Sequence, residues 1–164
     1  MSGPLPIEKI VSGGQSGVDR GALDAALAAG ISCGGWCPRG RRAEDGPIAS
    51  RYPLQETMTE RYEDRTEFNV RDSDATLVIA PPFPAGGTAY TLYQIEQYGR
   101  PWAVVDLERI AASSEHLESE SERIRTWIRT HNIRVLNVAG PRESKRPGAA
   151  ATTEQFLRSV LKLS

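Results

Sequence analysis

The sequence predicts a three-layer α/β fold, in which a mostly parallel sheet carries helices on both faces. Two observations lead to this prediction. Short apolar segments typical of strands alternate with longer segments of helical periodicity along most of the chain. Glycine-rich turns also follow three of the apolar segments, at the edge where parallel sheets bind ligands. Alternation of this kind is typical of a Rossmann-like domain.

The first half of the chain contains two expected strands and two expected helices. Residues 7–11 are largely apolar and stop at a glycine pair, which predicts a short strand. Residues 18–29 place alanine and leucine at helical spacing, and a glycine follows as the helix stop. Residues 31–36 are a second expected strand, and residues 60–71 an expected helix. The polar stretch 39–60 between them predicts mostly loop.

The second half repeats the alternation more clearly. Residues 75–80 are the strongest candidate for a buried strand, and two prolines that cannot continue a ladder close it. The remaining expected elements are helices over residues 88–98, 115–130 and 149–163, and strands over 101–106 and 133–138. No internal repeat or linker interrupts this order, so we expect one domain over residues 1–164.

Composition narrows the possible partners. The chain has 164 residues, 25% of them charged, and a net charge of −1, which indicates a globular protein without a basic field to attract nucleic acid. No segment approaches the roughly 20 apolar residues of a membrane span. The first residues lack the cationic and apolar regions of a signal peptide. From these three observations we expect that the protein binds no nucleic acid and no membrane and that its location is cytoplasmic.

The first glycine-rich turn, residues 12–20, precedes the first expected helix. Glycines allow the backbone to approach a ligand closely, and free N–H groups at a helix start attract anions. The spacing matches neither the dinucleotide fingerprint nor the Walker A loop. A tight turn capped by Ser16 or Asp19 is the alternative. The candidate ligand-binding residues of this turn are Gly13, Gly14, Gln15, Ser16, Gly17, Asp19 and Arg20.

The second turn follows the strongest expected strand. Gly86, Gly87 and Thr88 stand at the start of the next helix, where they offer backbone N–H groups and a hydroxyl to an anion. Thr88 could instead act as a simple N-cap. Its place at the carboxyl end of that strand favours a role in ligand binding.

Two basic loops complete the predicted site. The turn at residues 139–148 lies between the last strand and the last helix, and the loop at residues 37–46 follows the second strand, so both can reach the same sheet edge. Arginine forks there could hold a phosphate, whereas a solvated loop or a surface arginine cluster is the alternative. The candidate residues are Arg39, Arg41, Arg42, Glu44, Arg142, Glu143, Ser144 and Lys145.

Together these motifs resemble one known family. They are residues 12–20, 35–46, 52–54, Arg65-Thr66-x-x-Asn69-Val70, Ser73-Asp74, 86–88 and 137–144, which span nearly the whole chain. This combination is similar to the family named putative molybdenum carrier proteins, a circularly permuted YpsA-like branch of the SLOG group. The resemblance implies a Rossmann-like fold, a homo-oligomer (dimer or tetramer) and binding of molybdenum cofactor, a phosphorylated pterin that holds molybdenum through a dithiolene.

The wider group contains the LOG-type phosphoribohydrolases, which carry a catalytic glutamate shortly after a Pro-Gly-Gly-x-Gly-Thr run. In this sequence no carboxylate follows Thr88 until Glu96, about two helical turns later. Asp19, Glu44 and Glu143 could serve as acid or base, yet each lies beside an arginine that could pair with it. The residues do not assemble into a nucleophile, a base and an orienting group.

Metal binding has little support in the sequence. Cys33 and Cys37 lack a second Cys/His pair for a zinc site, and His116 and His131 lie far along the chain from the glycine-rich turns. We therefore expect a binding or carrier protein for a phosphate-bearing small molecule, with molybdenum cofactor as the implied ligand. A nucleotide-processing enzyme and a nucleotide-sensing module without catalysis are the alternatives.

Overall fold

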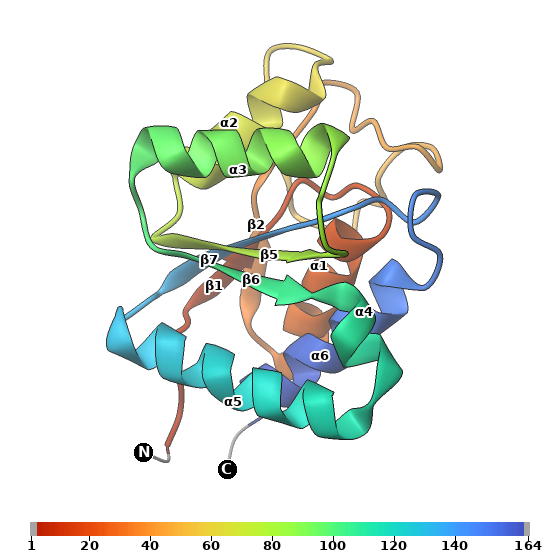
Figure 1. Cartoon of the computed structure of the whole chain (residues 1–164). Coiled ribbons are helices and arrows are strands. Elements are labelled where there is room, and N and C mark those ends of the chain that lie inside the picture. Colours follow the sequence, from red (N-terminus) through yellow and green to blue (C-terminus); the bar gives the residue numbers. More distant parts are fainter. Residues whose placement is uncertain (1–2, 163–164) are drawn as a thin grey trace.

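The computed structural model describes residues 3–162 and contains a five-stranded parallel sheet (Figure 1). Its spatial order is β2-β1-β7-β5-β6, and each neighbouring pair is parallel. The strands are β1 (Lys9–Val11), β2 (Ser32–Gly34), β5 (Ala75–Ala80), β6 (Trp102–Asp106) and β7 (Val135–Ala139). All six residues of β5 are buried, because this strand lies between β7 and β6 and both its faces are covered.

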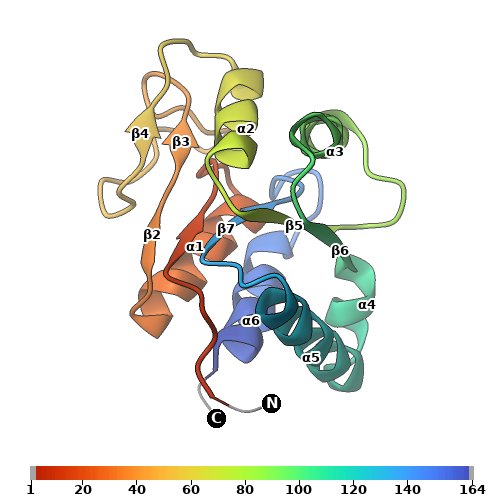
Figure 2. The same cartoon turned by 90° about the vertical axis from the view of Figure 1, so that its left-hand side faces the viewer.

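Helices cover both faces of the sheet (Figure 2). They are α1 (Val18–Ala29), α2 (Tyr62–Arg71), α3 (Gly86–Tyr98), α4 (Leu107–Ala112), α5 (Ser114–Thr130) and α6 (Ala149–Leu161). α6 packs against α1, α4 and α5 on one face, while α2 and α3 pack together on the other. The predicted three-layer α/β class with a parallel sheet is therefore confirmed.

The strand order shows a circular permutation of the Rossmann sheet. Suppose that β7 and α6 preceded β1 in the chain and that the strands were renumbered from β7. The spatial order of the sheet would then read 3-2-1-4-5, which is the Rossmann arrangement. In that arrangement the strand order reverses between β7 and β5. Ligands of open α/β sheets bind at such a switch point, beyond the carboxyl ends of the two strands.

The prediction of one continuous strand over residues 31–36 is wrong. β2 ends at Gly34, and the chain then turns at Gly35, whose φ is +122°. A Cβ at Gly35 would lie 2.4 Å from the Ser12 carbonyl oxygen, so only glycine fits this turn. The chain continues as β3 (Trp36–Cys37), which pairs with β4 (Gln55–Glu56) in a separate two-stranded sheet. The side chain of Asn69 exchanges two hydrogen bonds with the Trp36 backbone and attaches α2 to β3.

The other differences are at element ends. β4 and α4 were not predicted, since β4 is only two residues long and α4 follows β6 without a connecting loop. The side chain of Asp106 accepts hydrogen bonds from two backbone N–H groups of α4 and so starts it directly at the strand end. α3 begins two residues earlier than predicted. The last helix ends at Leu161, and the predicted end at residue 163 lies outside the described residues.

α1 and α6 approach each other closely at Gly21. A Cβ on Gly21 would lie 2.4 Å from the Ala150 carbonyl oxygen and 3.0 Å from Cβ of Thr153. Contact at this distance lets the two helices bury their apolar sides against the sheet as one layer. Within the described residues, no helix combines the length and the hydropathy needed to cross a membrane.

This contact yields a stability prediction. Gly21→Ala improves helix propensity by about 1 kcal/mol, but the backbone clash with α6 outweighs it, so we expect a net loss of roughly 1–3 kcal/mol in the free energy of unfolding. Gly87→Ala is the matched control, because nothing lies within 4 Å of a Cβ at this helical glycine. Urea denaturation measures both. Equal midpoints for Gly21→Ala and the unmodified protein would contradict the packing described.

Candidate ligand-binding cleft

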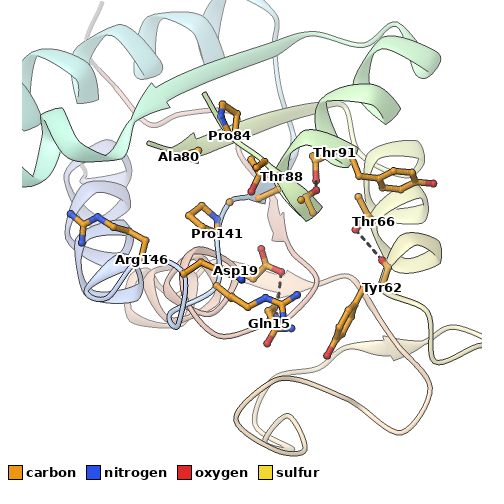
Figure 3. A pocket seen from close by; sticks show the side chains of 18 of the residues that line it. Gln15, Asp19, Tyr62, Thr66, Ala80, Pro84, Thr88, Thr91, Pro141 and Arg146 are labelled. Atoms are coloured by element: carbon orange, nitrogen blue, oxygen red, sulfur yellow. Dashed lines mark hydrogen bonds between the residues drawn. The ribbon is translucent and has the colours of Figure 1, made fainter. Parts of the chain in front are cut away.

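A cleft of about 620 Å³ opens beyond the carboxyl ends of β5 and β7, at the switch point of the sheet (Figure 3). One wall is the segment after β5 and the first turns of α3, with Pro84, Thr88 and Thr91. Opposite lie Gln15 and Asp19 of the first glycine-rich turn. The N-terminal part of α2 and the turn after β7 close the sides. Four segments far apart in sequence thus meet at one edge.

Asp19 and Arg65 form the floor of the cleft. Nη1 of Arg65 lies 3.4 Å from Oδ2 of Asp19, and the two side chains are 13% and 4% exposed. A Cβ on Gly13 would lie 2.3 Å from this Nη1, so the Arg65 side chain packs directly against the glycine. Burial raises the pKa of the Asp19 carboxyl above its ordinary value, against the opposing influence of Arg65 and the Gln15 N–H. A buried charged pair in a cleft is typical of functional sites.

Gln15, which lines the cleft, carries a buried donor that no described residue satisfies. Its Oε1 accepts hydrogen bonds from the N–H groups of Ser16 and Glu44, which fixes the orientation of the amide. Its Nε2 is buried and has no partner among the described residues, and the same holds for Nε of Arg65. Each unmet buried donor costs roughly 1–3 kcal/mol, so such groups call for an explanation.

The N-terminus of α3 is open to the cleft. No side chain caps it, although the first N–H groups of a helix have no partner within the helix. Gly86, Gly87 and Thr88 line the cleft here, and the Thr88 hydroxyl makes no hydrogen bond with any described residue. These N–H groups and the positive end of the helix dipole favour an anion at this place.

Basic side chains surround the mouth of the cleft. Lys145 and Arg142 line the cleft, and neither forms an ion pair with a described residue. The Arg142 guanidinium lies 5.4 Å from the ring centroid of Tyr62, a ring that Arg65 and Arg42 also approach at 5.4 and 5.6 Å. Arg42 is 4.0 Å from Glu60 and does not line the cleft. Several positive charges therefore gather around one aromatic ring at the rim.

The helix starts at the first and third turns are already occupied. Gly17 has a φ of +83°, and a Cβ on it would meet the Pro141 carbonyl oxygen at 2.4 Å, so the third turn packs directly over the start of α1. The N–H of Val18 donates to that carbonyl. The Glu143 carboxylate accepts from the N–H groups of Gly148 and Ala150 and caps α6. Both helix starts therefore already have acceptors within the protein.

Glu44 joins the arginine-rich loop to both turns. Its carboxylate accepts hydrogen bonds from the Ser16 hydroxyl at 2.8 Å and from the Ser144 N–H and hydroxyl at 3.0 and 2.6 Å. Partial burial opposes ionisation, but these hydrogen bonds hold the pKa of Glu44 below its ordinary value. A carboxylate of the protein thus takes the place that a bound anion could take.

Four of the predicted arginines, Arg42 among them, lie outside the cleft. Arg41 donates to four backbone carbonyls of residues 48–54 and shapes its own loop. Arg20 donates to the Gly14 carbonyl and pairs with Asp45 at 3.0 Å. Arg39 is exposed on the same loop. Gly14 has a φ of +74° and packs against side chains of residues 48–54.

Sequence reasoning missed several lining residues. Arg65 and Thr66 belong to a motif of the family resemblance, which was the available signal for them, but Tyr62 and Arg146 had none beyond aromatic and basic character. Arg146 pairs with Glu108 at the cleft rim. The two cysteines lie outside the cleft, and burial raises the pKa of each thiol. The described residues contain no group of three or more metal-ligating His, Cys, Asp or Glu side chains.

Comparison with known proteins agrees with this geometry. The sequence model of the circularly permutated YpsA SLOG family matches residues 10–161. The chain belongs to this family. Its strand order, with β7 as the displaced first strand of a Rossmann sheet, agrees with the circular permutation in the family's name.

One solved structure is closely similar to this family member. A protein from Syntrophus aciditrophicus SB named "Putative molybdenum carrier protein" shares 44% identity, with a TM-score of 0.90, over 96% of this chain and 97% of its own. No curated protein matches the chain. The predicted family resemblance is therefore confirmed. The expected homo-oligomer and cytoplasmic location stay predictions.

The position of Glu44 yields a pH prediction. Because the pKa of its carboxyl is lowered in the folded protein, its bridge is fully formed above the ordinary pKa of 4.5 and is lost as the pH falls through the lower folded value. The backbone amide resonance of Ser144 should report this titration with an inflection below pH 4.5. Glu44→Gln should abolish the inflection and the control Asp45→Asn should retain it. An inflection at or above 4.5 would contradict the bridge.

Proposed function

We propose that this protein binds and carries a phosphate-bearing small molecule in the cleft between β5 and β7, with molybdenum cofactor as the cargo. The observation that supports this most directly is the uncapped N-terminus of α3, which faces a cleft with Lys145 and Arg142 at its rim; neither of these side chains forms a salt bridge with a described residue. A phosphate at this place would accept hydrogen bonds from the backbone N–H groups and the Thr88 hydroxyl.

The size and lining of the cleft suit a ligand of this kind. A volume of about 620 Å³ is in the range of small-molecule sites, and its walls combine aromatic and proline side chains with a few polar groups. Tyr62 and Tyr90 could contact a flat ring system while the phosphate lies at α3. Molybdenum cofactor has both parts, and the similar Syntrophus protein is named as a molybdenum carrier.

The proposal predicts saturable binding that depends on the rim charges. Purified protein is titrated with molybdenum cofactor under anaerobic conditions, and separately with nucleoside monophosphates. Lys145→Ala and Arg142→Ala should each raise the dissociation constant roughly 3- to 30-fold, because each removes a charge-assisted contact to phosphate. Arg158→Ala is the matched control, since Arg158 pairs with Glu154 on α6 and does not line the cleft. Lack of saturable binding to every one of these ligands would refute the proposal.

A nucleotide-processing enzyme is the second candidate, and the geometry of Asp19 favours it over the other acids considered. Glu44 and Glu143 have their carboxylates in hydrogen bonds away from the cleft, and Glu96 does not line it. Asp19 lies on the cleft floor, and burial raises the pKa of its carboxyl, as a general acid requires. Incubating nucleoside monophosphates with the protein tests this candidate. Release of free base that Asp19→Asn abolishes would support it.

A further inference from the structure

One aromatic side chain of the cleft is open on both faces. Phe83 lines the cleft in the segment between β5 and α3, and it is 97% exposed. The other two aromatic residues of the lining already have partners. Guanidinium groups surround the Tyr62 ring, while Tyr90 contacts the Tyr93 ring and accepts a hydrogen bond from Gln94. No ring or guanidinium of the described residues contacts Phe83 in this way.

The backbone of Phe83 is strained. Its φ is +58°, in the left-handed region that favours glycine, and a bulky residue in this region is an outlier. Pro84 follows directly, although the residue before a proline normally takes an extended conformation. Pro81 and Pro82 restrict the chain on the other side, because their rings fix φ. The segment therefore has little freedom to relax around Phe83.

The needs of folding do not explain a phenylalanine at this position. A side chain that is 97% exposed contributes almost nothing to the apolar core, and glycine at Phe83 would relieve the backbone strain. Strained residues of this kind cluster in segments that hold ligands, where the strain keeps a side chain ready for contact. An open aromatic ring in a cleft is suited to a ligand that offers it a flat apolar face.

The chain also limits how far Phe83 lies from the proposed phosphate position. Gly86, the first residue of α3, follows three residues later, so the two Cα atoms are at most about 11 Å apart. Figure 3 shows Pro84, the neighbour of Phe83, on the same wall of the cleft as Thr88. A ligand whose phosphate accepts hydrogen bonds at the start of α3 can thus bring an attached ring to Phe83.

We propose that Phe83 stacks on the planar ring of a phosphorylated heterocyclic ligand whose phosphate lies at the N-terminus of α3. This inference rests on the proposed function, because both contacts are made by the same ligand. Stacking tolerates different ring systems, since every planar heterocycle presents a π-face. Phe83 thus supplies affinity for the ring, while the first N–H groups of α3 supply affinity for the phosphate.

The experiment measures how the side chain at this position changes binding. Molybdenum cofactor under anaerobic conditions, and GMP as a stable phosphorylated heterocycle, are titrated into the unmodified protein and into Phe83→Ala. We expect Phe83→Ala to raise the dissociation constant roughly 5- to 100-fold, the loss expected when an aromatic side chain that stacks on a base is removed. Trp102→Ala is the matched control, since Trp102 is 55% exposed and does not line the cleft, and it should bind like the unmodified protein.

Two further variants separate stacking from a structural role. Phe83→Trp should retain the affinity, and its additional indole fluorescence, relative to the unmodified protein, should be quenched when the ligand binds. Phe83→Gly should weaken binding as Phe83→Ala does but keep or raise the urea midpoint, because glycine tolerates a φ of +58°.

Each result decides the inference. Unchanged affinity in Phe83→Ala overturns the stacking role, and so does a loss of affinity in Phe83→Gly that is accompanied by a lower urea midpoint. In both cases the proposed function stands, because the unmodified protein still binds the ligand. If neither molybdenum cofactor nor any nucleoside monophosphate binds the unmodified protein, the stacking role and the proposed function both fall.

Discussion

The close contact between the first and third glycine-rich turns determines where the other parts of the site lie. Gly17 brings the start of α1 against the backbone of Pro141, and Gly140 lies so near β5 that a Cβ would be 2.1 Å from the Ile79 carbonyl oxygen. Any side chain at either position would push the turns apart. Because they touch, the space beyond β7 and β5 is closed on one side, and the cleft forms between these turns and α3.

The same contact explains why three similar turns have different roles. Glycine-rich helix starts at a parallel sheet edge all have the chemistry to bind anions. Here α1 is covered by a carbonyl and α6 is capped by Glu143, while Glu44 bridges Ser16 and Ser144. In these two turns, acceptor groups of the protein itself thus take the hydrogen bonds that a bound anion could accept. α3 differs, since no side chain caps it and its N–H groups face the cleft.

The elements with strong periodicity could be predicted from the sequence, because local pattern alone defines them. The largely apolar β5 and the amphipathic α5 are examples. The break at Gly35 could not, since it depends on the Ser12 carbonyl in the turn after β1 and on Asn69 of a distant helix. Residue type alone could not separate the roles of Arg41 and Arg65, since only the folded chain directs Arg41 to backbone carbonyls and Arg65 to Asp19 in the cleft.

The unmet donors of Gln15 and Arg65 connect stability with function. Each buried N–H without a partner lowers the free energy of unfolding by roughly 1–3 kcal/mol, and the raised pKa of Asp19 shows that its charge is also held at a cost. Two further buried polar atoms without a partner among the described residues, Nδ1 of His116 and Oγ1 of Thr153, lie away from the cleft. Part of this cost is therefore concentrated in residues that line the cleft, close to the uncapped start of α3. Residues of this region contribute less to the stability of the fold than well-paired residues would, as is common where a protein is shaped for binding.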